Sequence, residues 1–147
     1  MSNQPFVIER MFDVPITKVW NALTQNEQMK KWYFNLPDFK PVVGFEFQFT
    51  AGKEGRTLYK HLCRVTEVLP GKKLAYSWRY EGYPGNSLVT FELFEQGNKT
   101  RLKLTHAGLE TLAAGGPDFA KENFAAGWTS ILDQSLKGYL EKETVQA

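Results

Sequence analysis

The sequence is poor in the residues that build disulfides and metal sites. Its 147 residues include one cysteine, Cys63, and two histidines, His61 and His106. A single cysteine excludes an intrachain disulfide framework and any zinc or iron–sulfur site with several cysteine ligands. Two histidines are too few for a histidine-rich metal centre. We therefore expect neither a metal nor any other cofactor.

Long apolar runs and charge of one sign are also missing. No window approaches the ~18 consecutive apolar residues of a membrane-spanning helix. The start, MSNQPFVIER, lacks the basic stretch and apolar run of a secretory signal. The 18 lysines and arginines against 16 aspartates and glutamates give a net charge of +2, and no segment is basic enough to track a nucleic-acid backbone. These absences predict a single cytoplasmic domain over residues 1–147, with no membrane span and no nucleic-acid partner.

The usual catalytic motifs are not found either. No glycine-rich phosphate-binding loop follows any predicted strand. The pattern places no pair of carboxylates inside the fold, because Glu46, Glu92 and Glu95 are predicted to point outward or to lie at strand ends. General acid–base catalysis therefore lacks an obvious dyad. The sequence favours a protein that is not an enzyme and predicts no catalytic residue.

Aromatic residues, in contrast, are abundant. They make up 14% of the chain, with 11 phenylalanines, six tyrosines and four tryptophans. Such large side chains cannot all lie on the surface of a soluble protein. They indicate a thick core, an aromatic-lined pocket, or both.

The first third of the chain predicts a strand and two short helices. Residues 6–14 are expected to form the strand, and Pro15 suits the first turn of a helix because its missing N–H costs nothing there. Thr24 and Glu27 have the spacing of a capping box, which would begin a second short helix. Residues 36–41 are expected to form a loop or a short edge strand.

From residue 45 the apolar period changes to two. It predicts strands over residues 45–49, 58–69, 74–80, 89–93 and 101–106, and the short turns between them indicate an antiparallel meander. Residues 107–116 are expected to form a loop, and residues 117–142 one long helix. At a 3.6-residue period, its buried face is predicted to consist of Ala120, Phe124, Trp128, Ile131, Leu132, Ser135 and Tyr139.

Several short motifs in this order resemble a known family. They are Phe12 to Pro15, Val19 to Thr24, Trp32, Gly44 with Phe45, Val68 to Pro70, Leu104 to Leu109, and Gly127 with Trp128. From about Phe6 to Leu140, the chain resembles the activator-of-heat-shock-ATPase-homologue branch of the START-like superfamily, also called Bet v 1-like or SRPBCC. The resemblance implies an α+β helix-grip fold, in which a seven-stranded antiparallel sheet curves around the C-terminal helix and two short helices follow the first strand. It also implies a cavity between the sheet and that helix.

The histidines and the cysteine admit several interpretations. His61 and Cys63 share one face of a strand. In the predicted meander two other strands separate the strand of His106 from that of His61, which places them about 14 Å apart, too far to share a metal. A nucleophilic Cys63 with His61 as base lacks a third group to orient the histidine. His106 either fixes the 107–116 loop by bonding its carbonyls, or serves as a polar anchor in the cavity, or acts as a general acid–base.

The leading functional hypothesis is non-catalytic binding of a small hydrophobic or aromatic molecule. The helix carries Ser135 on its predicted apolar face and Gly127 and Gly138 at its margin, where a filled core would favour larger side chains. The predicted lining residues are Tyr59, His61, Tyr76, Trp78, Phe91, His106, Phe124 and Trp128. Plain core packing would also explain them, and the alternation leaves open which face of the 74–80 strand points inward.

Two other functions stay open. The first is a chaperone-regulator-like interaction domain with the ninety-kilodalton heat-shock chaperone or another protein as partner and a role in the stress response. The additional N-terminal domain of the full activators has no counterpart in this sequence, which argues against ATPase stimulation. The second is a cyclase-like or hydrolase-like enzyme, in which cavity shape steers a reactive substrate.

Overall fold

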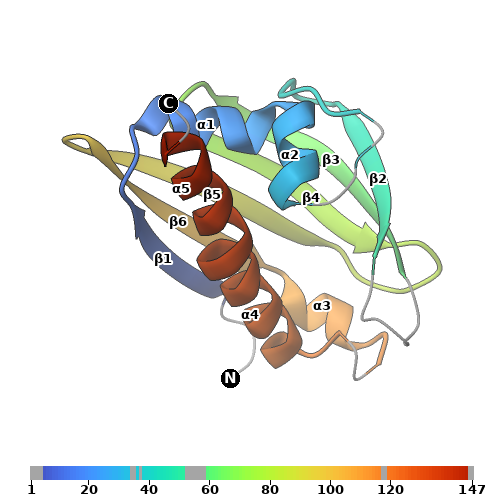
Figure 1. The fold of residues 1–147 in the computed structure, drawn as a ribbon. Helices are drawn as coiled ribbons and strands as arrows, with labels where there is room; N and C mark the ends of the chain where they lie inside the picture. Colours follow the sequence, from blue (N-terminus) through green and yellow to red (C-terminus); the bar gives the residue numbers. More distant parts are fainter. Residues whose placement is uncertain (1–4, 34–35, 37, 52–58, 117–118, 146–147) are drawn as a thin grey trace.

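Six antiparallel strands form one sheet in the order β1-β6-β5-β4-β3-β2 in the computed structural model (Figure 1). The model describes residues 5–33, 36, 38–51, 59–116 and 119–145. The strands are β1 (Phe6–Phe12), β2 (Glu46–Ala51), β3 (Tyr59–Leu69), β4 (Lys73–Tyr80), β5 (Ser87–Gln96) and β6 (Lys99–Ala107). They correspond to the six strands that the apolar pattern predicts. The fold class is confirmed.

The seven-strand sheet expected from the resemblance is wrong, because the described residues contain six strands. The segment between the second helix and β2 pairs with no strand over residues 38–43. Pro41 in that segment has no N–H to donate to a ladder. Phe39 packs edge-on against Phe47 instead, with ring centroids 5.1 Å apart. Side-chain burial, and not strand pairing, therefore holds this segment.

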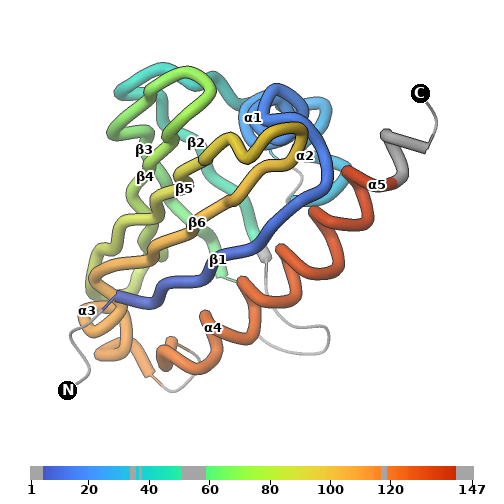
Figure 2. The backbone as a smooth tube through the Cα atoms, turned by 90° about the vertical axis from the view of Figure 1, so that its left-hand side faces the viewer, coloured from blue at the N-terminus to red at the C-terminus, as the bar shows by residue number. Residues whose placement is uncertain are grey.

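The helices cover one face of the sheet. They are α1 (Ile16–Thr24), α2 (Asn26–Trp32), α3 (Leu109–Ala113), α4 (Lys121–Ser130), the π-helical segment η2 (Ile131–Leu136) and α5 (Lys137–Val145). Segments α4, η2 and α5 follow one another as a long C-terminal helix that crosses the concave side of the sheet, while α1 and α2 lie across its end (Figures 1 and 2). No helix among the described residues is long and apolar enough to cross a membrane.

Two local expectations need correction, and a third lies outside the described residues. Thr24 is the last residue of α1 and its hydroxyl donates to the Trp20 carbonyl at 2.8 Å, so it does not cap α2, which begins after Gln25 without a side-chain cap. The expected loop over residues 107–116 contains α3. Helix α4 begins at Lys121, whereas the predicted opening at Pro117 and Asp118 lies outside the described residues.

The buried side of the C-terminal helix also differs from the predicted stripe. Its fully buried side chains are Trp128, Leu132, Leu136 and Leu140, spaced by four residues. The i→i+5 hydrogen bonds of η2 widen the helix, so more than 3.6 residues make one turn and the inward face shifts. Ser135 is therefore exposed, contrary to prediction, and so are Gly127 and Gly138. The argument that small residues on this face leave a cavity no longer holds.

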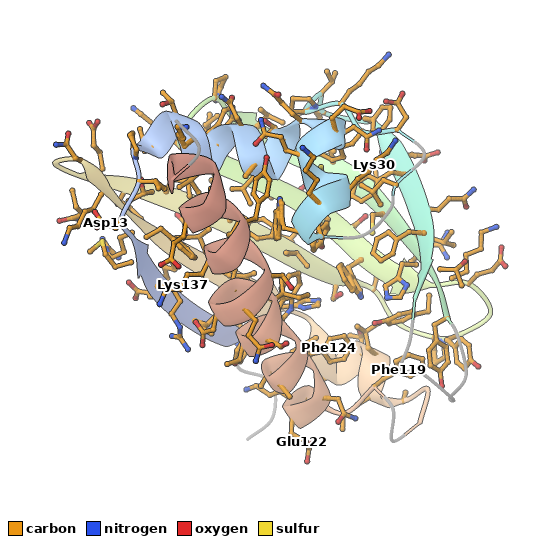
Figure 3. All side chains as sticks on the ribbon, viewed as in Figure 1. Asp13, Lys30, Phe119, Glu122, Phe124 and Lys137 are labelled. Carbon is orange, nitrogen blue, oxygen red and sulfur yellow. The ribbon has the colours of Figure 1, made fainter. Side chains whose placement is uncertain are left out.

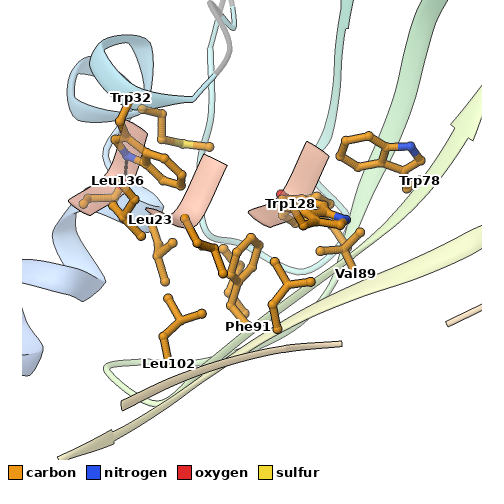
Figure 4. Packing of buried hydrophobic residues seen from close by; sticks show 14 of the residues in the cluster. Leu23, Trp32, Trp78, Val89, Phe91, Leu102, Trp128 and Leu136 are labelled. Atoms are coloured by element: carbon orange, nitrogen blue, oxygen red, sulfur yellow. Dashed lines mark hydrogen bonds between the residues drawn. The ribbon is translucent and has the colours of Figure 1, made fainter. Parts of the chain in front are cut away.

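The core lies between this helix and the sheet. Trp128 and Leu136 contact a layer of buried residues from β5 and β6, including Val89, Phe91 and Leu102 (Figure 4). At the sheet edge, Arg10 of β1 forms a two-point ion pair with Asp133 of η2, with its Nε 2.6 Å from Oδ1. The helix is thus held by apolar packing along its length and by an ion pair at β1.

Candidate functional site

A continuous group of aromatic rings lies between the sheet and α4. We call it the aromatic cluster, and it consists of Tyr33, Phe49, Tyr59, His61, Tyr76, Trp78, Tyr80, Phe91, His106, Phe119, Phe124 and Trp128. All eight residues predicted to line a cavity belong to it. Each member contacts at least one other ring, with centroids between 4.4 and 6.5 Å apart.

Sequence reasoning missed four members of the aromatic cluster. Phe49 and Tyr80 lie in phase with inward residues of predicted strands, so the alternation contained the signal for them. Tyr33 and Phe119 lie in connecting segments without a period, where nothing in the sequence indicates a direction. They enter the cluster through tertiary packing, with Tyr33 stacked near Trp128 and Phe119 against Tyr80.

Trp78 of β4 lies at the centre of the aromatic cluster. Its ring centroid is 5.6 Å from that of Trp128 on α4, 5.0 Å from His61 and 5.6 Å from His106. Strands β4 and β5 separate the two histidine strands, as predicted. The curvature of the sheet nevertheless brings both imidazoles against one indole. The described residues contain no group of three side chains placed to hold a metal.

His106 is completely buried and bonded through both ring nitrogens. The indole N–H of Trp128 donates to Nδ1 at 3.0 Å, so Nδ1 carries no proton. The proton therefore lies on Nε2, which donates to the Ser87 hydroxyl at 2.8 Å, and that hydroxyl donates to the Trp78 carbonyl at 2.7 Å. Burial lowers the pKa of His106 to about 3, which keeps the ring neutral.

This arrangement corrects the expectation that His106 bonds carbonyls of the 107–116 loop. Its partners are side chains of β5 and α4. The contact between Ser87 and His106 also differs from a nucleophile–base pair, because a base must accept the serine proton on Nε2. Here Nε2 is the donor. The chain of bonds from Trp128 to Trp78 joins α4 to three strands of the sheet.

His61 and Cys63 are both in the core. The His61 ring stacks on Phe49 with centroids 4.4 Å apart, and its Nδ1 lies 3.0 Å from the Tyr59 carbonyl, which requires Nδ1 to carry the proton. Burial lowers the pKa of His61 to about 4. Burial raises the pKa of Cys63 far above its usual range, so the thiol stays protonated. The prediction of Cys63 as a small core residue is confirmed.

Two further polar contacts lie inside the aromatic cluster. The hydroxyls of Tyr33 and Tyr76 are 2.6 Å apart and share a hydrogen bond. The indole N–H of Trp78 donates to the Tyr80 hydroxyl at 2.9 Å. Burial raises the pKa of all three tyrosines, so each phenol is neutral at physiological pH. The cluster is therefore apolar and uncharged, with a few oriented O–H and N–H groups.

The aromatic cluster reaches the surface at one end of the sheet. There Tyr59 contacts Phe119 and Tyr83, with ring centroids 4.8 and 5.4 Å apart. Tyr83 is 39% exposed, and Tyr59 and Phe124 are half-buried. Phe119 and Phe124 lie beside the start of α4 at this end (Figure 3). The rings thus form a path from solvent to Trp78 and Trp128.

A separate groove of about 520 Å³ lies on the opposite, outer face of the sheet. Its lining residues are Glu46, Phe47, Gln48, Leu62, Cys63, Arg64, Ser77, Arg79 and Asn86. The polar side chains among them alternate with the buried residues of β2 to β4. None of its lining residues belongs to the aromatic cluster, so it is a different surface.

Comparison with known proteins identifies relatives by sequence and by fold. The model of a family described as Activator of Hsp90 ATPase homolog 1-like protein matches residues 13–141. A comparison with curated proteins gives no match.

Three solved structures are similar in sequence and fold. Protein MLL2253 from Mesorhizobium loti is 28% identical with a TM-score of 0.74, over 95% of this chain and 98% of that one. Protein BH1534 from Bacillus halodurans is 26% identical with a TM-score of 0.71, over 92% and 96%. CalU16 from Micromonospora echinospora is 26% identical with a TM-score of 0.69, over 97% and 79%.

Proposed function

The chain belongs to the Activator of Hsp90 ATPase homolog 1-like family and has a START-like helix-grip fold, and we propose that it binds a small apolar or aromatic molecule without transforming it. The proposed site is the aromatic cluster between the sheet and α4. A fold of this kind hosts unrelated functions, so the proposal depends on the site and not on the architecture.

One observation carries the proposal. The aromatic cluster is continuous from the buried Trp78 and Trp128 to the half-buried Tyr59 and Phe124, and Tyr59 contacts the exposed Tyr83 outside the cluster. A cluster that served only as core would gain stability from being covered at that end. Ring faces that reach solvent offer an aromatic ligand stacking partners along the whole path.

The polar groups of the cluster support binding over catalysis. His106 cannot accept the Ser87 proton, because Nε2 already carries one. The Cys63 thiol is protonated and has no base to activate it. The outward position of Glu46, Glu92 and Glu95 leaves no carboxylate in the cluster. The remaining N–H and O–H groups can orient a ligand but supply no acid–base pair at neutral pH.

Tryptophan fluorescence tests the proposal, since two of the four tryptophans belong to the aromatic cluster. A panel of 2-acetylnaphthalene, 9-fluorenone and palmitate should quench the intrinsic emission saturably for at least one member. Trp128→Leu should weaken that response. Trp20→Leu, which removes a tryptophan of α1 outside the cluster, is the matched control and should not. A panel without any saturable response would refute the proposal.

A second candidate function is protein interaction, favoured by apolar side chains on the segment before β2. Val42 and Val43 are 59% and 61% exposed, which is unusual for adjacent large apolar residues. The family description makes the Hsp90 chaperone the partner to test. Capture of Hsp90 by the wild-type chain, lost in a Val42→Ser/Val43→Ser double variant, would support this function. Equal or absent capture by both proteins would reject it.

A further inference from the structure

The hydroxyl group of the buried Tyr80 has no acceptor for its proton among the residues that the structure describes. The residue is 5% exposed. Its oxygen accepts the Trp78 indole N–H at 2.9 Å, and no atom of the described part of the chain accepts its own proton. Buried polar groups in proteins are nearly always paired. A donor left over beside the proposed ligand path is therefore a feature that a ligand can satisfy.

The Trp78 contact determines where this proton points. Because the indole N–H occupies one side of the Tyr80 oxygen, the hydroxyl hydrogen must turn away from Trp78. The Tyr80 ring is bordered by Phe119 at 4.5 Å, His61 at 4.7 Å and Tyr59 at 5.9 Å between centroids. The ring that carries the donor is thus bordered by three other rings, one tilted and two nearly edge-on.

We infer that Tyr80 donates its hydroxyl proton to a carbonyl oxygen of the ligand, and that the ligand is an uncharged aromatic ketone or quinone. This inference rests on the proposed function. An acceptor is required because Tyr80 supplies a donor. A carbonyl fits better than a ligand hydroxyl, since a hydroxyl would bring a second proton that also needs an acceptor.

The surroundings also determine the charge and shape of the ligand. No member of the aromatic cluster is a lysine, an arginine or a charged carboxylate, so a carboxylate or phosphate would lose its hydration without gaining a counter-ion. The neighbouring rings offer stacking and edge contacts to a planar molecule. These two conditions together exclude fatty acids and phosphorylated compounds as the preferred ligands.

Binding of the ligand would also strengthen the hydrogen bond from the Trp78 indole N–H to the Tyr80 hydroxyl. In the series Trp78 N–H, Tyr80 O–H and ligand C=O, each hydrogen bond strengthens the one before it. The Trp78 indole N–H therefore reports on the occupancy of the Tyr80 donor. A ligand without an acceptor can contact the same rings but cannot produce this effect.

A matched pair of ligands tests the inference. In 2-acetylnaphthalene and 2-isopropenylnaphthalene a carbonyl oxygen is exchanged for a CH₂ group of similar shape. Wild-type protein should bind the ketone about tenfold more tightly than the alkene, the factor that one buried hydrogen bond supplies. Tyr80→Phe should bind both equally and keep the affinity for the alkene. Tyr139→Phe, which alters a tyrosine outside the aromatic cluster whose hydroxyl donates to Oε1 of Gln28 at 3.0 Å, should keep the wild-type preference.

The outcomes separate this inference from the proposed function. Equal affinity of wild-type protein for the two compounds would overturn the role of Tyr80 and leave the binding function standing. Binding of neither compound would overturn the inference, and would overturn the binding function as well if 9-fluorenone and palmitate also give no saturable response. Nitrogen-15 NMR of the wild type gives a second measurement that does not require the Tyr80→Phe variant to fold. The ketone should shift the Trp78 indole N–H signal downfield relative to the alkene, and identical shifts would overturn the inference.

Discussion

The polar groups that bond to His106 have determined proton positions. Trp128 donates a hydrogen bond to Nδ1 of His106, so His106 donates from Nε2 to the Ser87 hydroxyl. The Ser87 hydroxyl in turn donates its hydrogen bond to the Trp78 carbonyl. A serine 2.8 Å from an imidazole is in this case a structural tether. The direction of the protons, and not the distance, distinguishes it from an activated nucleophile.

Removing the Ser87 hydroxyl tests this tether. Ser87→Ala leaves Nε2–H of His106 without its acceptor in a completely buried site, which should lower the free energy of unfolding by ~1–3 kcal/mol in urea titrations. Ser77→Ala is the matched control, because Ser77 is on the outer face and its hydroxyl is 3.5 Å from the Arg64 carbonyl. That variant should change stability by less than about 0.5 kcal/mol. Similar small effects at both serines would contradict the tether.

The two buried histidines should make the fold sensitive to acid. Burial lowers the pKa of His61 to about 4 and that of His106 to about 3, whereas both titrate near ~6.5 in the unfolded chain. Their contribution to stability is complete above pH ~6.5 and is lost as the pH falls, because the unfolded chain binds protons first. We expect the free energy of unfolding to fall by ~2 kcal/mol per histidine between pH 7 and pH 5.

Urea titrations at successive pH values measure this slope. His61→Phe keeps a flat ring on Phe49 but removes one titrating group, so the loss between pH 7 and pH 5 should shrink by about half. A wild-type free energy that stays constant over this range would mean that the imidazoles are hydrated in the folded state.

At the scale of elements, η2 decides which side chains of the C-terminal helix face the sheet. A regular α-helix would turn Ser135 inward, whereas the π-helical segment places Leu136 in the core and Ser135 in solvent. Leu136→Ala should therefore cost ~2–5 kcal/mol of unfolding free energy. Ser135→Ala should change it by less than about 0.5 kcal/mol. If thermal or urea unfolding showed a larger stability loss for Ser135→Ala than for Leu136→Ala, the helix would instead have the regular 3.6-residue register.

The position of α3 depends on a close contact with the loop between β4 and β5. The Thr111 hydroxyl accepts the Asn86 N–H at 3.0 Å, and a Cβ on Gly85 would collide with the Thr111 carbonyl. Gly85→Ala should thus destabilise the protein by more than about 2 kcal/mol. Gly82 in the same loop also has a positive φ but open space around it, so Gly82→Ala should cost only ~1–2 kcal/mol. Equal losses would mean that α3 moves aside freely.

At the scale of the whole molecule, the sheet was more predictable than the helix that crosses it. A period of two is preserved when strands twist, so the sequence showed which residues of β4 and of β5 share a face, although for β4 it did not show which face points inward. The register of the C-terminal helix could not be read from the sequence, because no residue type marks a π-helical turn. Ser135 also fits an apolar stripe with a 3.6-residue period. The expectation of a seventh strand was based on the family resemblance. The sequence of segment 38–43 has no alternating pattern that predicts a strand.

The candidate site was predictable in its residues but not in its bonds. Strand phase identified Trp78 and His106 as inward residues. The partners of His106 come from β5 and α4, which meet only in the folded chain, so no local pattern indicates them. Tyr33 and Phe119 were missed for the same reason. The direction of the Tyr80 hydroxyl proton depends on the hydrogen bond from Trp78. The two residues are an i,i+2 pair on one strand, and such a pair forms no distinctive sequence motif.

A ligand held between the sheet and the C-terminal helix should stabilise the whole fold, because the helix cannot leave the sheet while both contact the same molecule. For 2-acetylnaphthalene at about 100 times its dissociation constant, mass action adds ~2.7 kcal/mol to the free energy of unfolding. For a chain of this length, that corresponds to a rise of roughly 5–10 °C in the melting temperature. Calorimetry of wild-type protein measures the shift. Arg79→Gln, in the groove on the outer face, should leave the rise in melting temperature unchanged. If the rise disappeared in this variant, the ligand would bind on the outer face and not in the aromatic cluster.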